Sequence, residues 1–179
     1  MKQWEKIVLL FLVTIFLFNS PFTLKGQNVT KVVRVKSGGI ISINFNSINE
    51  YSSGKSLNSW SRLNISFADT TDVGGDGTSI GWKLSVRAGS SAIISDGASP
   101  NLALSNMEIR PTTTIPGTTV TNIVLSDADQ EIVSGPDPGT TTTTGEVVLS
   151  YDCGITTPLL GTTPDYYYVE LIFTLVELP

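Results

Sequence analysis

The sequence predicts an all-β fold, a single antiparallel β-sandwich of about eight strands. Short segments in which apolar and polar residues alternate recur along the chain, and stretches rich in Gly, Pro, Asp or Asn separate them. Alternation at every second residue is the period of a half-buried strand, whereas the separating residues favour turns. No helical periodicity persists in the sequence, and only residues 47–56 have room for one helical turn.

The clearest pair of strands lies between residues 62 and 87. An acidic, Gly-rich loop joins the two strands. Their apolar side chains occupy alternate positions, namely Leu63, Ile65 and Phe67, then Ile80, Trp82, Leu84 and Val86. We therefore predict that each strand turns one face to the core and the other to solvent.

The same pattern predicts the remaining strands. The full set covers residues 29–35, 40–46, 62–68, 79–88, 106–110, 119–125, 146–152 and 166–177, with shorter edge pairings at 92–95 and 131–133. The Thr run at 140–144 has two interpretations, a mobile loop or an extension of the strand that follows it. The terminal strand is apolar on most of both faces. Such a strand is expected at the centre of a sheet or beneath a partner chain.

The first residues predict export. Lys2 and Lys6 precede an apolar run at 7–18, which suits a signal sequence but is short for a helix that crosses about 30 Å of hydrocarbon. We predict a signal peptide at residues 1–26 and an exported domain at 27–179, extracellular or on the cell surface. The alternative is an uncleaved N-terminal anchor. No second apolar run of spanning length follows, so no transmembrane span is expected in the mature chain.

The net charge argues against one class of partner, and the single cysteine argues against stabilisation by a disulfide. The formal net charge is −5 at pH 7, which repels phosphate backbones and argues against a nucleic-acid partner. Cys153 is the only cysteine, so no internal disulfide can form and the core must supply the stability. Cys153 itself is either a small buried apolar side chain or a reactive thiol.

The sequence argues against an enzyme. It contains no His, which excludes a Ser-His-Asp triad and a His-ligated metal. A pair of carboxylates could hydrolyse a glycoside, but Asp69, Asp72 and Asp76 lie on a Gly-rich loop and not on rigid strands at an obvious cleft. Residues 74–77 lack the Lys-Ser/Thr that completes a phosphate-binding loop.

Two acidic clusters are candidates for a Ca²⁺ site, the one cofactor that the sequence suggests. The first cluster is Asp69, Asp72 and Asp76, and the second is Asp127, Asp129 and Glu131. The spacing of the first does not fit the alternating ligands of an EF-hand. Both clusters therefore have two interpretations, solvated turn acids or metal ligands.

The order of these features resembles the WxL domain, a β-domain of bacterial cell surfaces. Its first motif, an Asp-containing loop before a Gly-Trp-x-Leu strand, matches residues 69–77 and 81–84. Its closing strand matches Tyr168 onward, with Phe173 where the family has Trp, then Leu175 and a final Pro179. The resemblance implies non-covalent attachment to peptidoglycan and participation in a surface complex. It does not imply catalysis.

The aromatic residues fall into two groups according to whether they lie on the apolar or the polar face of their predicted strand. Trp82 and Leu84 share one face of their strand, and Phe173 and Leu175 share one face of the other, so we predict that this motif packs in the core. Three other aromatic residues lie out of phase with the apolar faces and are the candidates for ligand binding: Trp60, Tyr166 and Tyr168. Their rings could stack on a sugar, although Trp60 could also be a lid on the core.

Together these observations predict an exported, non-catalytic surface module for attachment to the cell envelope or for assembly of a surface complex. Its partners would be an envelope glycan or other surface proteins, and self-assembly is left open. One alternative is a fimbrial or pilus-type structural subunit or adhesin. Another is a carbohydrate-binding module.

Overall fold

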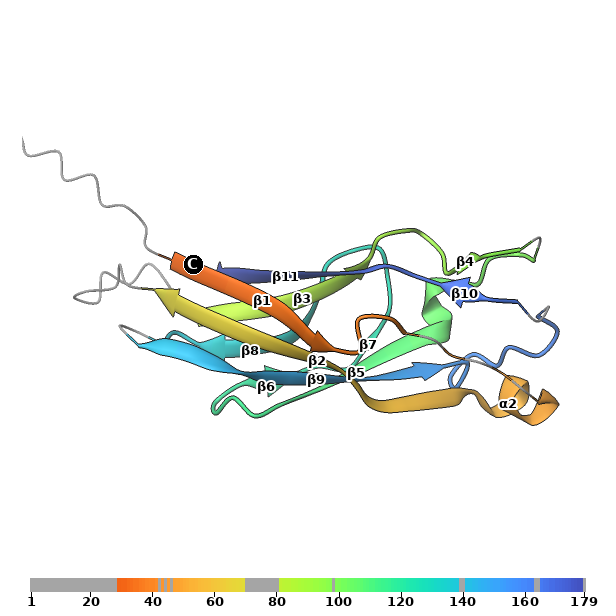
Figure 1. Ribbon diagram of the computed structural model, residues 1–179, viewed down its shortest axis with the longest axis horizontal. Helices are drawn as coiled ribbons and strands as arrows, with labels where there is room; N and C mark the ends of the chain where they lie inside the picture. The colour runs from red at the N-terminus through yellow and green to blue at the C-terminus, as the bar shows by residue number, and fades with distance from the viewer. Residues whose placement is uncertain are drawn as a thin grey trace, which may run out of the picture.

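The computed structural model describes residues 29–41, 43, 45, 47–69, 81–97, 99–138, 141–162 and 165–178. These residues form an all-β, sandwich-like fold (Figure 1), which confirms the predicted fold class. Helical structure is limited to the short helix α2 (Ile48–Ser53) and the 3-10 turn η1 (Leu104–Asn106) within this part of the chain. Neither of them has the length or apolar character to span a membrane.

The larger sheet has five strands in the order β1-β2-β9-β5-β7, and every neighbouring pair is antiparallel. Its strands are β1 (Val29–Ser37), β2 (Lys55–Asp69), β9 (Thr142–Cys153), β5 (Met107–Thr113) and β7 (Ile123–Val124). The strand β9 begins inside the Thr run, so for Thr142–Thr144 the second interpretation, an extension of the strand, is correct.

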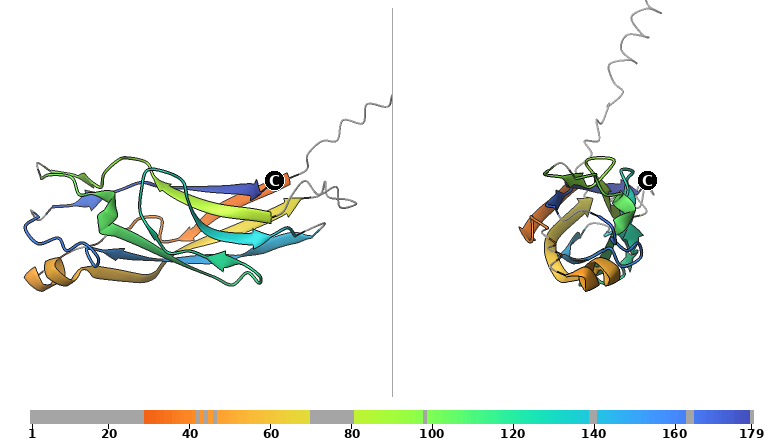
Figure 2. Two further views of the ribbon diagram at one scale, coloured as in Figure 1. Left: turned by 180° about the vertical axis from the view of Figure 1, so that it is seen from behind. Right: turned by 90° about the vertical axis from the view of Figure 1, so that its right-hand side faces the viewer.

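The smaller sheet has four strands in the order β11-β3-β8-β6, also antiparallel. Its strands are β11 (Leu171–Leu178), β3 (Gly81–Ala88), β8 (Gln130–Pro136) and β6 (Thr119–Val120). A separate ladder joins β4 (Ile94–Ser95) to β10 (Tyr167–Tyr168). Seen from the end, the five-stranded and the four-stranded sheet curve around a shared interior (Figure 2).

The core fills the space between these sheets. On β2 the alternate residues Leu63, Ile65 and Phe67 are at most 2% exposed, and on β3 Trp82 and Leu84 are 0% exposed. The predicted inner face of each strand is therefore confirmed among the described residues, which exclude Ile80. Each fully buried large side chain of this kind contributes about 1.5–3 kcal/mol relative to an exposed one, so this row supplies much of the stability. The opposite face of β3 is not open to solvent as predicted, because Ser85 is buried and Lys83 and Arg87 are half-buried.

The one-turn helix expected within residues 47–56 is present as α2. Ser47 caps it, because its hydroxyl oxygen accepts a hydrogen bond of 3.2 Å from the backbone N–H of Glu50. Gly54 ends it with φ of 73°, a conformation that favours glycine. The chain then enters β2 directly.

The strand predicted at residues 40–46 is wrong. Of the described residues in that range, none belongs to a strand, while Ser42, Asn44 and Asn46 lie outside the described part. Ile41, Ile43 and Phe45 nevertheless pack against the core as half-buried residues. These alternate apolar residues are thus partly buried without belonging to a strand, because the chain leaves the ladder with β2 at Gly38, whose φ is 67°.

The single terminal strand predicted at residues 166–177 is also wrong. It divides into β10 and β11, with Val169 and Glu170 between them. β11 does not lie at the centre of its sheet: it pairs with β3 on one side, and its other side forms an open edge among the described strands. Most of its residues are half-buried. The predicted central position is therefore wrong, and cover by a partner chain stays a prediction.

Candidate functional site

The candidate site is a cleft along the seam where the edges of the two sheets meet. The edge strands β1 and β11 run side by side in opposite directions (Figures 1 and 2). At one end an ion pair joins them across the seam, with 3.5 Å between Lys31 Nζ and Glu177 Oε2. No β-ladder joins the two strands. Away from this ion pair, toward the end of β1 and the start of β11, the cleft opens between them.

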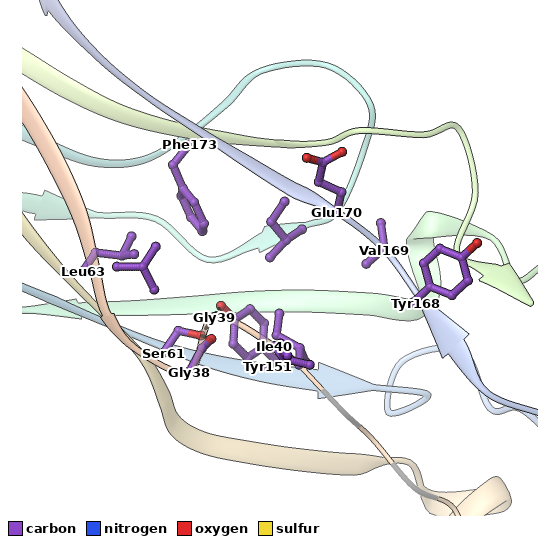
Figure 3. A pocket seen from close by; sticks show the side chains of 13 residues that line it. Gly38, Gly39, Ile40, Ser61, Leu63, Tyr151, Tyr168, Val169, Glu170 and Phe173 are labelled. Atoms are coloured by element: carbon purple, nitrogen blue, oxygen red, sulfur yellow. Dashed lines mark hydrogen bonds between the residues drawn. The ribbon is translucent and has the colours of Figure 1, made fainter. Parts of the chain in front are cut away.

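The cleft has a volume of about 300 Å³. One wall comes from the segment after β10 and the start of β11, and the other comes from the end of β1, the segment after it, β2 and β9 (Figure 3). Its lining residues are Val35, Gly38, Gly39, Ile40, Ile41, Ser61, Leu63, Tyr151, Tyr168, Val169, Glu170, Leu171 and Phe173. A volume of this size lies at the lower end of the range for small-ligand sites.

Large apolar side chains at the mouth of the cleft are exposed. Val35 is 56% exposed, Ile40 is 82% exposed and Tyr168 is 56% exposed. Isolated exposed apolar residues are ordinary, but a group around one concave site indicates a binding surface. The sequence pattern did not identify Val35 or Ile40 as binding residues. Val35 faces inward on β1, and Ile40 belongs to the wrongly predicted strand.

A chain of hydrogen bonds fixes one wall of the cleft. The buried hydroxyl of Tyr151 donates to Ser61 Oγ at 2.9 Å, and Ser61 Oγ donates to the carbonyl of Gly38 at 2.6 Å. Burial raises the pKa of Tyr151, an effect that its hydrogen bond with Ser61 opposes in part. A Cβ atom at Gly38 would lie 2.3 Å from the carbonyl oxygen of Trp60, so this close approach of two backbones requires glycine.

Trp60 supports the same wall from outside. It lies within β2 and not before it, next to a register shift between Leu57 and Ser61 and after Ser59, whose φ is 51°. The Trp60 side chain is 42% exposed, and its Nε1 donates a 2.9 Å hydrogen bond to the carbonyl of Ile40. Trp60 therefore tethers the exposed segment that borders the cleft.

The structure separates the two candidate tyrosines. Tyr168 lines the cleft, whereas Tyr166 is 79% exposed and is not among the lining residues. The segment that carries both is anchored at Asp165, which accepts hydrogen bonds from Ser95 Oγ at 2.6 Å and from the backbone N–H of Tyr166 at 2.8 Å. Hydrogen bonds from Ser95 and then Ser99 hold the pKa of Asp165 below its usual range.

The Gly-Trp-Lys-Leu motif lies in the core and not at the surface. The ring of Trp82 lies 6.5 Å from that of Phe67, and its Nε1 is buried with no hydrogen-bond partner among the described residues. Leu175 pairs with Leu84 and is 9% exposed, whereas Phe173 is half-buried and lines the cleft. Of the four motif residues, only Phe173 thus reaches the candidate site.

The calcium hypothesis lies largely outside the described residues. Asp72 and Asp76 belong to the undescribed loop, and the side chain of Asp69 at the end of β2 is likewise not described. In the second cluster, Asp129 lies 3.6 Å from Arg87 in an ion pair. Across the described ranges, no three Asp, Glu or Cys side chains gather as a cation would require.

A second polar feature, on β5 and β9, consists of a bidentate ion pair. Arg110 Nε and Nη2 lie 2.5 and 2.9 Å from the carboxylate oxygens of Asp152. Burial acts to raise the pKa of Asp152, but hydrogen bonds from Arg110 and Ser56 outweigh it, and the pKa lies below its usual value. With its charge already paired, Asp152 is poorly suited to proton transfer, and we assign the pair a structural role.

Cys153 is a buried free thiol at the end of β9. Burial raises its pKa to about 11, and the neutral thiol is a poor nucleophile. We expect the melting midpoint to be the same with and without reductant, and Cys153 to react with a thiol reagent at pH 8 only after denaturation. A melting midpoint that falls on reduction would instead reveal an intermolecular disulfide through Cys153.

Comparison of the chain with protein-family models and with curated proteins finds no match. The WxL-like character of the chain therefore stays a prediction from its motifs.

Proposed function

We propose that this chain is an exported, non-catalytic surface module that attaches to the cell envelope through the cleft between β1 and β11, with a peptidoglycan glycan as the ligand. The observation that carries this proposal is the group of exposed apolar and aromatic side chains at the mouth of the cleft, Val35, Ile40 and Tyr168.

The chemistry of the lining suits a sugar. Tyr168 offers a ring face of the kind that stacks on the apolar face of a pyranose, while its hydroxyl can hydrogen-bond. The open edges of β1 and β11 add backbone groups that their own sheets do not pair. A few placed polar groups on an apolar wall are the usual composition of a small-ligand site.

The same lining supports a non-catalytic role. Glycoside hydrolysis by the common mechanisms needs two carboxyl groups on either side of the scissile bond. Among the described residues that line the cleft, Glu170 is the single carboxylate. The sequence has no His to act as a base in its place.

The test is sedimentation of the chain from Gln27 onward with washed peptidoglycan sacculi. We expect the wild-type protein to pellet with the sacculi, and Tyr168→Ala to bind roughly tenfold more weakly because a stacking contact is lost. Tyr166→Ala is the matched control: it removes the same side chain two residues away, outside the cleft, and should bind as the wild type does.

Two results would contradict the proposal. Wild-type protein that stays in the supernatant at every salt concentration would rule out attachment to peptidoglycan. Equal binding by wild type, Tyr166→Ala and Tyr168→Ala would show that sacculi are bound elsewhere on the protein.

A further inference from the structure

The open edge of β11 lacks the features that usually prevent edge-to-edge association. Proteins protect such edges with Pro, Lys, β-bulges or inward-pointing charges. β11 has eight residues, contains no Pro, Lys or Arg, and pairs with β3 without a register shift. Apart from the buried Leu175, its side chains are half-buried, so the strand offers apolar contacts on each face to another strand.

One end of this edge is protected within the molecule. Lys31 and Glu177 occupy inward-facing positions, opposite Phe67 and Trp82 respectively, and form the ion pair across the seam. The other end carries no such pair: Leu171 and Phe173 line the open cleft. Only the half of the edge at residues 170–175 is therefore available for a further strand.

The two edge strands carry opposite charges. β1 contains Lys31, Arg34 and Lys36 and no acidic residue, whereas β11 and the residue before it contain Glu170 and Glu177 and no basic residue. Pairing of β1 with another β1, or of β11 with another β11, would oppose like charges, which is destabilising. Pairing of β1 with β11 opposes unlike charges.

We propose that β11 of one copy pairs edge to edge with β1 of a second copy, at the open end of the seam. This rests on the proposed surface module and names its assembly partner. Because Leu171 and Phe173 line the cleft, β1 of the second copy and a glycan would compete for its open end, so the contact forms without peptidoglycan. The interface is heterologous, because different surfaces of the two copies meet. A heterologous contact that does not close into a ring produces an open chain of subunits.

Two exposed charges at the open end provide the test. Arg34 is exposed and has no ion-pair partner among the described residues, and Glu170 is exposed directly before β11. Neither supports the fold through a salt bridge within the described part, so reversing either charge should leave the monomer intact. The attraction should also weaken as salt rises, since both charges are exposed to solvent.

The experiment is sedimentation velocity of the chain from Gln27 onward, without sacculi, over a series of protein and salt concentrations. We expect concentration-dependent association of the wild type that decreases with salt. Arg34→Glu and Glu170→Lys should each weaken association roughly tenfold, because each replaces an attraction by a repulsion. An equimolar mixture of the two variants should regain association, since the reversed β1 of one then faces the reversed β11 of the other.

The control is Glu131→Lys, which makes the same charge change as Glu170→Lys at an exposed position on β8. It should associate as the wild type does. A wild type that is monomeric at every concentration, variants that associate as strongly as the wild type, or a mixture that does not regain association would each overturn the proposal. A monomer that still pellets with sacculi would overturn this inference and leave the proposed attachment standing.

Discussion

Replacement of Trp82 by alanine is expected to lower the free energy of unfolding by about 3–5 kcal/mol, the usual cost of removing a large buried aromatic side chain. Trp82 is 0% exposed and its ring lies against that of Phe67. The substitution leaves a cavity between the two sheets that the surrounding strands cannot fill without distortion. The loss should appear as a lower midpoint in urea denaturation followed by circular dichroism, with poor solubility during expression.

Trp60→Ala is the matched control for this prediction. Trp60 is 42% exposed and loses one hydrogen bond, to the carbonyl of Ile40, which corresponds to about 1 kcal/mol. If Trp82→Ala kept the wild-type urea midpoint and lost binding to sacculi, the Gly-Trp-Lys-Leu motif would itself be the binding surface, contrary to its buried position.

Gly135→Ala should be nearly as damaging, although it adds only one methyl group. A Cβ atom at Gly135 would lie 2.6 Å from both Cε2 and Cζ2 of Trp82, a separation that real structures do not tolerate. The indole ring is rigid and fully enclosed, so it cannot move aside without disturbing β3 and β8. We expect a loss of about 3 kcal/mol, the upper part of the usual range for overpacking, measured by the same denaturation.

A double-mutant cycle assigns this cost to the contact with Trp82. Trp82→Leu removes all three indole atoms nearest to Gly135, Cε2, Cζ2 and Nε1, so Gly135→Ala should cost at least about 1 kcal/mol less in that background. If the two substitutions instead have additive effects on the free energy of unfolding, the cost of Gly135→Ala arises from the backbone of β8 and not from the ring.

The central strands could be predicted from the sequence because their alternation is a local property. Each apolar residue of β2 and β3 lies on a strand whose inner face is buried along its length, so every second position reports the core. The same argument correctly gave the outward direction of Trp60 and Tyr168. It failed at residues 40–46, where Ile41, Ile43 and Phe45 are half-buried although none of the described residues belongs to a strand.

The cleft itself could not be predicted, since it depends on which strands lie at the sheet edges. The pattern of β11 shows apolar residues on both faces, and this is equally true of a strand at the centre of a sheet and of one at an uncovered edge. Ile40 and Val35 became candidates only when the structure placed them across from Leu171 and Phe173. Pairing partners are set by the whole chain, and no segment carries that information alone.

The ion pair between Lys31 and Glu177 has a consequence for the order of folding. It joins the first and last strands of the described chain, so the loop that it closes includes nearly every other element. Contacts at such sequence separation form late, because the entropy of closing the loop must be met by structure already in place. During synthesis the two sheets can begin to assemble before β11 exists, but the cleft has both walls only after the last strand has joined β3.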